Sequence, residues 1–97
     1  MDLYLSEKEL TSIDDIPENV IYLNVSWNRL TSLPILPDSL EKLDCCNNQL
    51  TSLPQLPDRL KKLYCMGNQL MSLPILPDSL EILWCYENRL THLPPLP

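Results

Sequence analysis

The sequence repeats itself with a period of 20 residues, and this repetition limits the possible folds more than any other feature of the chain. Three consecutive segments align without a gap from Leu30, Leu50 and Leu70, and 11 of their 20 positions are identical in all three. A more diverged copy starts at Leu10. Fixed periods of this length are typical of repeat proteins, in which each unit buries its apolar side chains against its neighbours.

The period also gives the organisation of the chain. The predicted parts are a half repeat 1–9, repeats 10–29, 30–49, 50–69 and 70–89, and a partial repeat 90–97. No linker or block of charge separates them, so we expect a single domain. The ten prolines exclude long helices, because an interior proline removes a backbone donor and clashes with the preceding turn.

Each unit combines a short strand with an extended return segment. Apolar residues alternate with other residues at Leu43 and Cys45, which is the period of a β-strand. The segment before it contains Pro34 and Pro37, and proline favours an extended, polyproline-like backbone. Neither half can bury its leucines alone. We therefore expect neighbouring units to stack their strands into one parallel sheet.

The repeated residues carry a resemblance to a known family. Leu40, Leu43, Cys45, Asn48 and Leu50 form the pattern L-x-x-L-x-C-x-x-N-x-L, which recurs 20 and 40 residues later. This pattern resembles the leucine-rich repeat. The half unit L-P-x-L-P resembles in particular the short, 20-residue bacterial subclass found in type III secretion effectors and in some large-virus proteins.

The resemblance implies a leucine-rich-repeat solenoid. In such a fold about five short parallel strands line a concave face, the convex side is extended, and there is little or no helix. It also implies an effector-like, cytoplasmic protein that works in the host cytosol if it is secreted.

Four asparagines recur just after the predicted strands, at Asn28, Asn48, Asn68 and Asn88. None begins a glycosylation sequon. A buried amide must satisfy both its donors and its acceptor. We therefore expect these residues to form a structural ladder that binds the turn backbone of their own and neighbouring units.

The cysteines are predicted to be free thiols. Cys45, Cys65 and Cys85 occupy the second inward position of the strand, where their Cβ vectors run parallel rather than toward each other. The paired spacing of zinc ligands is absent, so no metal site is expected. Alternation places Cys46 on the outer face, and we expect it to be the one reactive thiol.

The outward strand positions carry five of the six aromatic residues. Such aromatics either pack across strands or serve recognition, in which Trp and Tyr give large contact areas with a polar handle. We favour recognition, because the leucines already fill the core. The predicted anchor is a C-terminal cluster, and lysines and an aspartate supply the polar side. The candidate protein-binding residues are Tyr22, Lys42, Asp44, Lys62, Tyr64, Met66, Ile82, Trp84 and Tyr86.

Charge and motifs exclude several other functions. The net charge of −6 argues against nucleic acid and anionic membrane surfaces as partners. The longest uncharged stretch, 63–77, contains two prolines and is too short to span a bilayer, so no membrane insertion is expected. The single His92 has no evident nucleophile partner, and there is no glycine-rich phosphate loop. We therefore expect neither catalytic residues nor a cofactor.

Two hypotheses for the function remain. The first is a non-catalytic module that binds a protein partner, of unknown identity, through the concave sheet face. The alternative is a structural, self-assembling repeat scaffold, as a fragment or an engineered array, that associates through exposed solenoid ends. In the alternative, the C-terminal repeat would form a homodimer, because an edge strand with unpaired backbone groups is a template for pairing.

Overall fold

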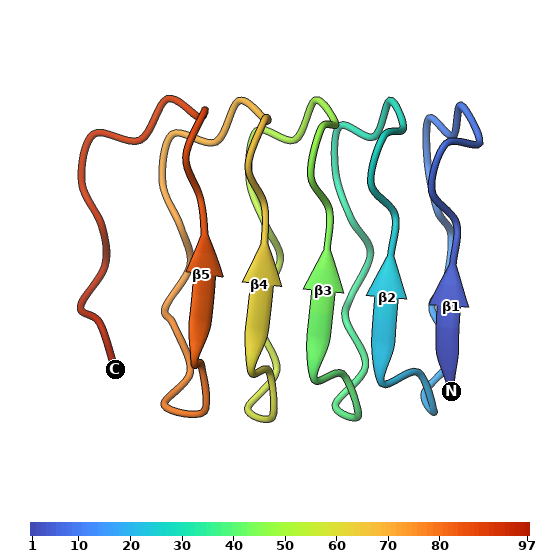
Figure 1. Ribbon diagram of the computed structural model, residues 1–97, viewed down its shortest axis with the longest axis horizontal. Coiled ribbons are helices and arrows are strands. Elements are labelled where there is room, and N and C mark those ends of the chain that lie inside the picture. Colours follow the sequence, from blue (N-terminus) through green and yellow to red (C-terminus); the bar gives the residue numbers. More distant parts are fainter.

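Five short parallel strands form one sheet in the computed structural model, which describes residues 1–97 (Figure 1). The strands are β1 (Asp2–Tyr4), β2 (Tyr22–Asn24), β3 (Lys42–Asp44), β4 (Lys62–Tyr64) and β5 (Ile82–Trp84). They lie side by side in chain order, and each residue pairs with the residue 20 positions later. No helix is present. This confirms the predicted solenoid and the repeat spacing on which it depends.

The core lies between the sheet and the return segments, which run behind the strands in Figure 1. The central leucine of each inner strand, Leu23, Leu43 or Leu63, is fully buried. Val25, Cys45 and Cys65, two residues further on, are also fully buried. Burying one such leucine side chain contributes about 1.5–3 kcal/mol. Because each residue stacks on its counterpart in the next unit, the leucines of one unit are buried only when neighbours are present.

The return segments contribute leucines from the opposite side. Leu36, Leu56 and Leu76 are buried there, whereas the intervening Ile35 and Ile75 are 89% and 86% exposed. Each return segment ends in a tight turn that begins at proline, for example where the Leu40 N–H donates to the Pro37 carbonyl at 3.1 Å. This turn reverses the chain into the next strand.

A second turn follows each strand and uses a left-handed backbone conformation. The residues concerned, with φ between 55° and 71°, are Glu7, Trp27, Asn47, Gly67 and Glu87. Their N–H groups face the next unit, and that of Asn47 donates to the Met66 carbonyl at 2.9 Å. At Gly67 a Cβ would lie 2.4 Å from Asn47 Oδ1, so the Asn47 side chain would have to move to make room for it.

Candidate functional site

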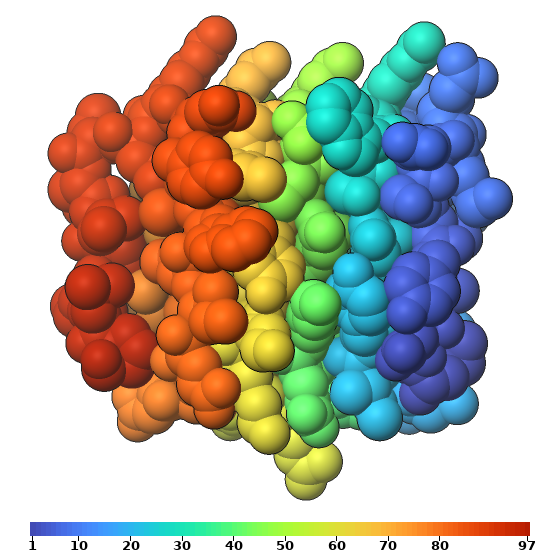
Figure 2. Space-filling model, viewed as in Figure 1, coloured from blue at the N-terminus to red at the C-terminus, as the bar shows by residue number.

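Three columns of side chains cover the sheet on the side away from the core, and we call this surface the sheet face (Figure 2). The first column is Asp2, Tyr22, Lys42, Lys62 and Ile82; the second is Tyr4, Asn24, Asp44, Tyr64 and Trp84; the third, just after the strands, is Ser6, Ser26, Cys46, Met66 and Tyr86. All nine residues that the sequence singles out for protein binding lie on this face.

Aromatic and cationic side chains form a row across all five strands. The Tyr64 and Trp84 rings pack with their centroids 4.5 Å apart. The Lys42 ammonium lies over the Tyr22 ring at 4.4 Å and faces the Tyr64 ring at 5.5 Å. Tyr22 in turn meets Tyr4 edge to face, with centroids 5.4 Å apart. These contacts restrict the orientations of the rings on the sheet face.

Asp44 is the acidic group at the middle of this face. Its Oδ1 accepts a hydrogen bond from the Cys46 backbone N–H at 3.2 Å. The two ion pairs of the molecule, Arg29–Glu9 and Lys61–Glu41, do not involve it. Burial first, and the Asp44 charge second, raise the pKa of the Tyr22 phenol. The Asp44 carboxylate is therefore an acceptor without a cationic partner in the molecule.

The expectation that Cys46 is an exposed, reactive thiol is wrong. Cys46 does occupy an outward column, but only 4% of its surface is exposed. Burial, followed by the hydrogen bond and charge of Asp44, raises the pKa of its thiol to about 12. Neutral thiols are poor nucleophiles. Cys46 is thus part of the floor of the sheet face, and the half-buried Cys85 is the most accessible thiol of the chain.

A shallow hollow of about 330 Å³ opens beside Cys46, and we refer to it as the hollow. Its lining residues are Ser26, Trp27, Lys42, Asp44, Cys46, Asn47, Tyr64, Met66 and Trp84. Of these, Lys42 belongs to the first column, and Asp44, Tyr64 and Trp84 belong to the second. Trp27 and Asn47 were not predicted from the sequence, because they belong to the left-handed turns rather than to the strands. The aromatic type of Trp27 is the one sequence signal that points to it.

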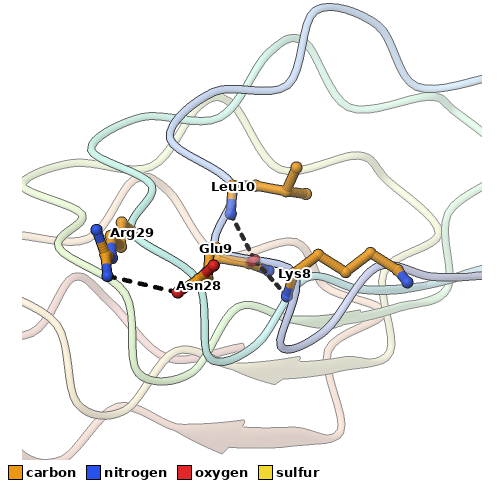
Figure 3. Close-up of polar contacts among 5 residues, drawn as sticks. All are labelled: Lys8, Glu9, Leu10, Asn28 and Arg29. Atoms are coloured by element: carbon orange, nitrogen blue, oxygen red, sulfur yellow. Dashed lines mark hydrogen bonds and ion pairs between the residues drawn. The ribbon is translucent and has the colours of Figure 1, made fainter.

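The recurring asparagines connect successive units (Figure 3). Asn28 Oδ1 accepts hydrogen bonds from the N–H groups of Lys8 and Leu10 at 3.1 and 2.9 Å. Its Nδ2 donates to the carbonyls of Leu5 and Val25 at 2.8 and 2.9 Å. One amide therefore bonds its own strand end and the backbone of the preceding unit.

The same arrangement repeats at the three later positions, Asn48, Asn68 and Asn88. Asn68 Oδ1 accepts from the Leu50 N–H at 3.0 Å, and its Nδ2 donates to the Cys45 and Cys65 carbonyls at 3.0 and 3.1 Å. Asn88 makes the corresponding bonds to units 70–89 and 50–69 but is only half buried. No buried polar side-chain atom of the structure lacks a partner.

Neither a metal site nor a membrane span is found in the structure. No three His, Cys, Asp or Glu side chains come together as metal ligands would. No helix has the length and apolar composition needed to cross a membrane.

Comparison with known proteins identifies the repeat. The sequence model of the family described as leucine-rich repeats (two copies) matches residues 38–78. No curated protein sequence matches the chain significantly.

Solved structures of bacterial proteins resemble the whole chain. The leucine-rich repeat domain of a Shigella effector superimposes with a TM-score of 0.94 and 44% identity, covering 99% of this chain and 44% of that one. YopM from Yersinia enterocolitica superimposes with a TM-score of 0.90 and 39% identity, and the match covers 92% of this chain and 20% of that one. YopM from Yersinia pestis, a leucine-rich effector protein, superimposes with a TM-score of 0.95 and 41% identity, and the match covers 98% of this chain and 27% of that one. The chain thus spans less than half of each of these three structures.

Proposed function

Because the chain is a leucine-rich repeat protein of the bacterial type, we propose that it is a non-catalytic module that binds a protein partner through the sheet face. The row of aromatic and cationic side chains across the five strands carries this proposal. The scaffold does not need these rings, because its core consists of leucines and other residues on the opposite side of the sheet. Similarity to effector proteins supports action in the cytoplasm, and in the host cytosol if the protein is secreted.

The C-terminal half of the sheet face supplies the apolar anchor. Trp84 and Tyr86 are 47% and 57% exposed, and Tyr64, Met66 and Ile82 stand beside them half buried. Large aromatics that keep substantial exposed area on a rigid surface are typical of binding hot spots. The polar side of the contact is formed by three further residues, Lys42, Asp44 and Lys62, and Tyr22 extends it toward β1.

A pair of matched double variants tests this proposal. Tyr64→Ser with Trp84→Ser removes the anchor from the sheet face, whereas Ile35→Ser with Ile75→Ser removes exposed apolar area from the return side. Each immobilised protein is incubated with eukaryotic cytosol, and the retained proteins are quantified by mass spectrometry. We expect one set of proteins to be retained by the parent and the return-side variant and lost with the sheet-face variant.

The controls for this experiment are thermal unfolding and circular dichroism of each variant, so that a folded state is established first. Equal retention by the two double variants would contradict the proposal, because it would mean that the sheet face does not select the partner.

Self-assembly through the C-terminal repeat is the second candidate function, and in a polypeptide of these 97 residues the edge at β5 favours it. The N–H groups of Cys65 and Gly67 donate to the Trp84 and Tyr86 carbonyls at 2.8 and 3.2 Å. The equivalent N–H groups of Cys85 and Glu87 have no acceptor in the 97-residue chain. Unpaired donors beside exposed aromatics form a surface on which a second copy can pair.

A further inference from the structure

Trp27 combines an unfavourable backbone conformation with an exposed side chain. Its φ is 56°, in the left-handed region that bulky residues rarely adopt. The equivalent positions of two later units carry Asn47 and Gly67, which tolerate this region well. Trp27 also remains 61% exposed, so burial in the core does not compensate for the strain. Strain of this kind is concentrated at functional sites.

The turn that strains Trp27 also places it beside the middle of the sheet face. Its N–H donates to the Cys46 carbonyl at 3.0 Å, which holds the Trp27 backbone next to the third column. Its side chain lines the hollow together with Asp44 and Tyr64. In Figure 2, bulky side chains of the cyan segment after β2 and of the orange segment around β5 stand on either side of the green β3 segment.

The hollow thus pairs a carboxylate with aromatic rings. Asp44 Oδ1 accepts from the Cys46 N–H, and neither ion pair of the molecule involves the Asp44 carboxylate. Lys42 also lines the hollow, but its ammonium lies closer to the Tyr22 ring (4.4 Å) than to the Tyr64 ring (5.5 Å). A carboxylate without an ion-pair partner beside aromatic faces is suited to a guanidinium group, which stacks on rings and donates two parallel N–H groups to one carboxylate.

We propose that the hollow receives one arginine side chain of the protein partner, with the guanidinium bound by Asp44 and flanked by Trp27 and Tyr64. This inference rests on the proposed function and adds the chemistry that the partner must present. The volume of about 330 Å³ lies near the lower limit of ligand pockets, about 300–1,000 Å³, and fits one side chain. The net charge of −6 also favours approach of a basic segment.

The test uses a small probe, so it does not require the partner. N-acetyl-arginine methylamide is titrated into the protein, and the two indole N–H signals and the backbone amide signals are followed by NMR. The matched lysine derivative and the uncharged citrulline derivative serve as comparison probes. We expect a saturable shift of the Trp27 indole and Cys46 amide signals with arginine, weaker shifts with lysine and none that saturate with citrulline.

Two variants assign the response to the hollow. Asp44→Asn should abolish saturation and keep the fold, because Asn24 occupies the equivalent position of the previous unit and accepts the Ser26 N–H in the same way at 3.0 Å. Trp27→Asn should weaken arginine binding at least fivefold without lowering the melting temperature, since asparagine tolerates the left-handed turn. Asp78→Asn, on an exposed turn far from the hollow in sequence, should leave binding unchanged.

Citrulline and arginine derivatives that shift the same signals equally would overturn the inference, as would arginine binding that survives Asp44→Asn. Either result leaves the proposed function standing if the anchor variant Tyr64→Ser with Trp84→Ser still loses its retained proteins. If instead Tyr64→Ser with Trp84→Ser retained the same proteins as the parent, while the parent still bound the arginine derivative, the proposed function would be contradicted and the arginine site would stand.

Discussion

At the scale of single residues, the asparagine amides join the units with more hydrogen bonds than any other side chain. Replacing Asn68 by alanine leaves the Leu50 N–H and the Cys45 and Cys65 carbonyls without their side-chain partner inside the protein. We expect Asn68→Ala to lower the free energy of unfolding by about 1–3 kcal/mol, the usual cost of unsatisfied buried groups. Urea denaturation measures this change. Asn88→Ala serves as the comparison and should cost less, because Asn88 is half buried and water can replace its amide.

The thiols provide a second prediction at this scale. Cys85 is half buried, whereas Cys45, Cys46 and Cys65 are buried. Burial raises the pKa of all four thiols, and those of Cys46 and Cys65 reach about 12. In the folded protein, a thiol reagent at neutral pH should therefore modify Cys85 first and the other three much more slowly. Peptide mapping after timed quenching gives the order, and rapid modification of Cys46 would contradict the burial described above.

The sequence predicts whether a strand side chain points toward or away from the core, but not how far residues of other units bury it. Alternation correctly turns Leu43 and Cys45 toward the core, because a strand has a period of two. The same alternation turns Cys46 outward but contains no information about its neighbours. Those neighbours come from other units, and Met66 and Trp27 line the same hollow as Cys46. Coverage of this kind depends on the turns, which the pattern does not describe.

At the scale of the repeated element, the turn after each strand has the same left-handed backbone in every unit but not the same residue. Asn47 and Gly67 suit its left-handed backbone, while Trp27 and Glu87 do not. The single glycine of the chain could have indicated this conformation, but one residue in five equivalent positions is a weak signal. The strands themselves were predictable because their leucines recur at a fixed spacing. The conformation of the turn was not predictable, since its five equivalent positions carry four different residue types.

Two substitutions in these turns should have opposite effects on stability. Gly67→Ala introduces a Cβ at 2.4 Å from Asn47 Oδ1 and places a side chain in a left-handed conformation. We expect it to destabilise the protein by about 1–2 kcal/mol. Glu87→Gly relieves a left-handed conformation at an exposed residue, and should stabilise the protein by up to about 1 kcal/mol. Thermal unfolding of both variants at equal concentration measures the difference, and a shift of the same sign in both would refute the explanation.

At the scale of the whole molecule, the stack determines where a partner can bind. The order β1 to β5 and the 20-residue register follow from the period, so the three columns of the sheet face could be written down from the sequence. The contacts between members of these columns could not be predicted from the sequence. The Lys42 ammonium, for example, can reach the rings of both neighbouring strands and lies closer to one of them. The identity of the partner depends on such contacts rather than on the fold.

The open edge at β5 gives the last prediction, which concerns a polypeptide of these 97 residues. Cys85 and Glu87 present unpaired N–H groups there, and Trp84 and Tyr86 add exposed apolar area beside them. We expect this polypeptide to form a two-fold dimer through its C-terminal half at high micromolar concentration. Edge pairing would give the N–H donors acceptors and would bury the apolar surface beside them. Light scattering after gel filtration over a concentration series measures the mass. Trp84→Lys should restore the monomer, since a lysine at an edge strand opposes pairing. Ile75→Lys, on the return side, should leave the dimer intact. A parent chain that stays monomeric throughout the series would contradict this prediction and leave the aromatic cluster accessible to a different protein.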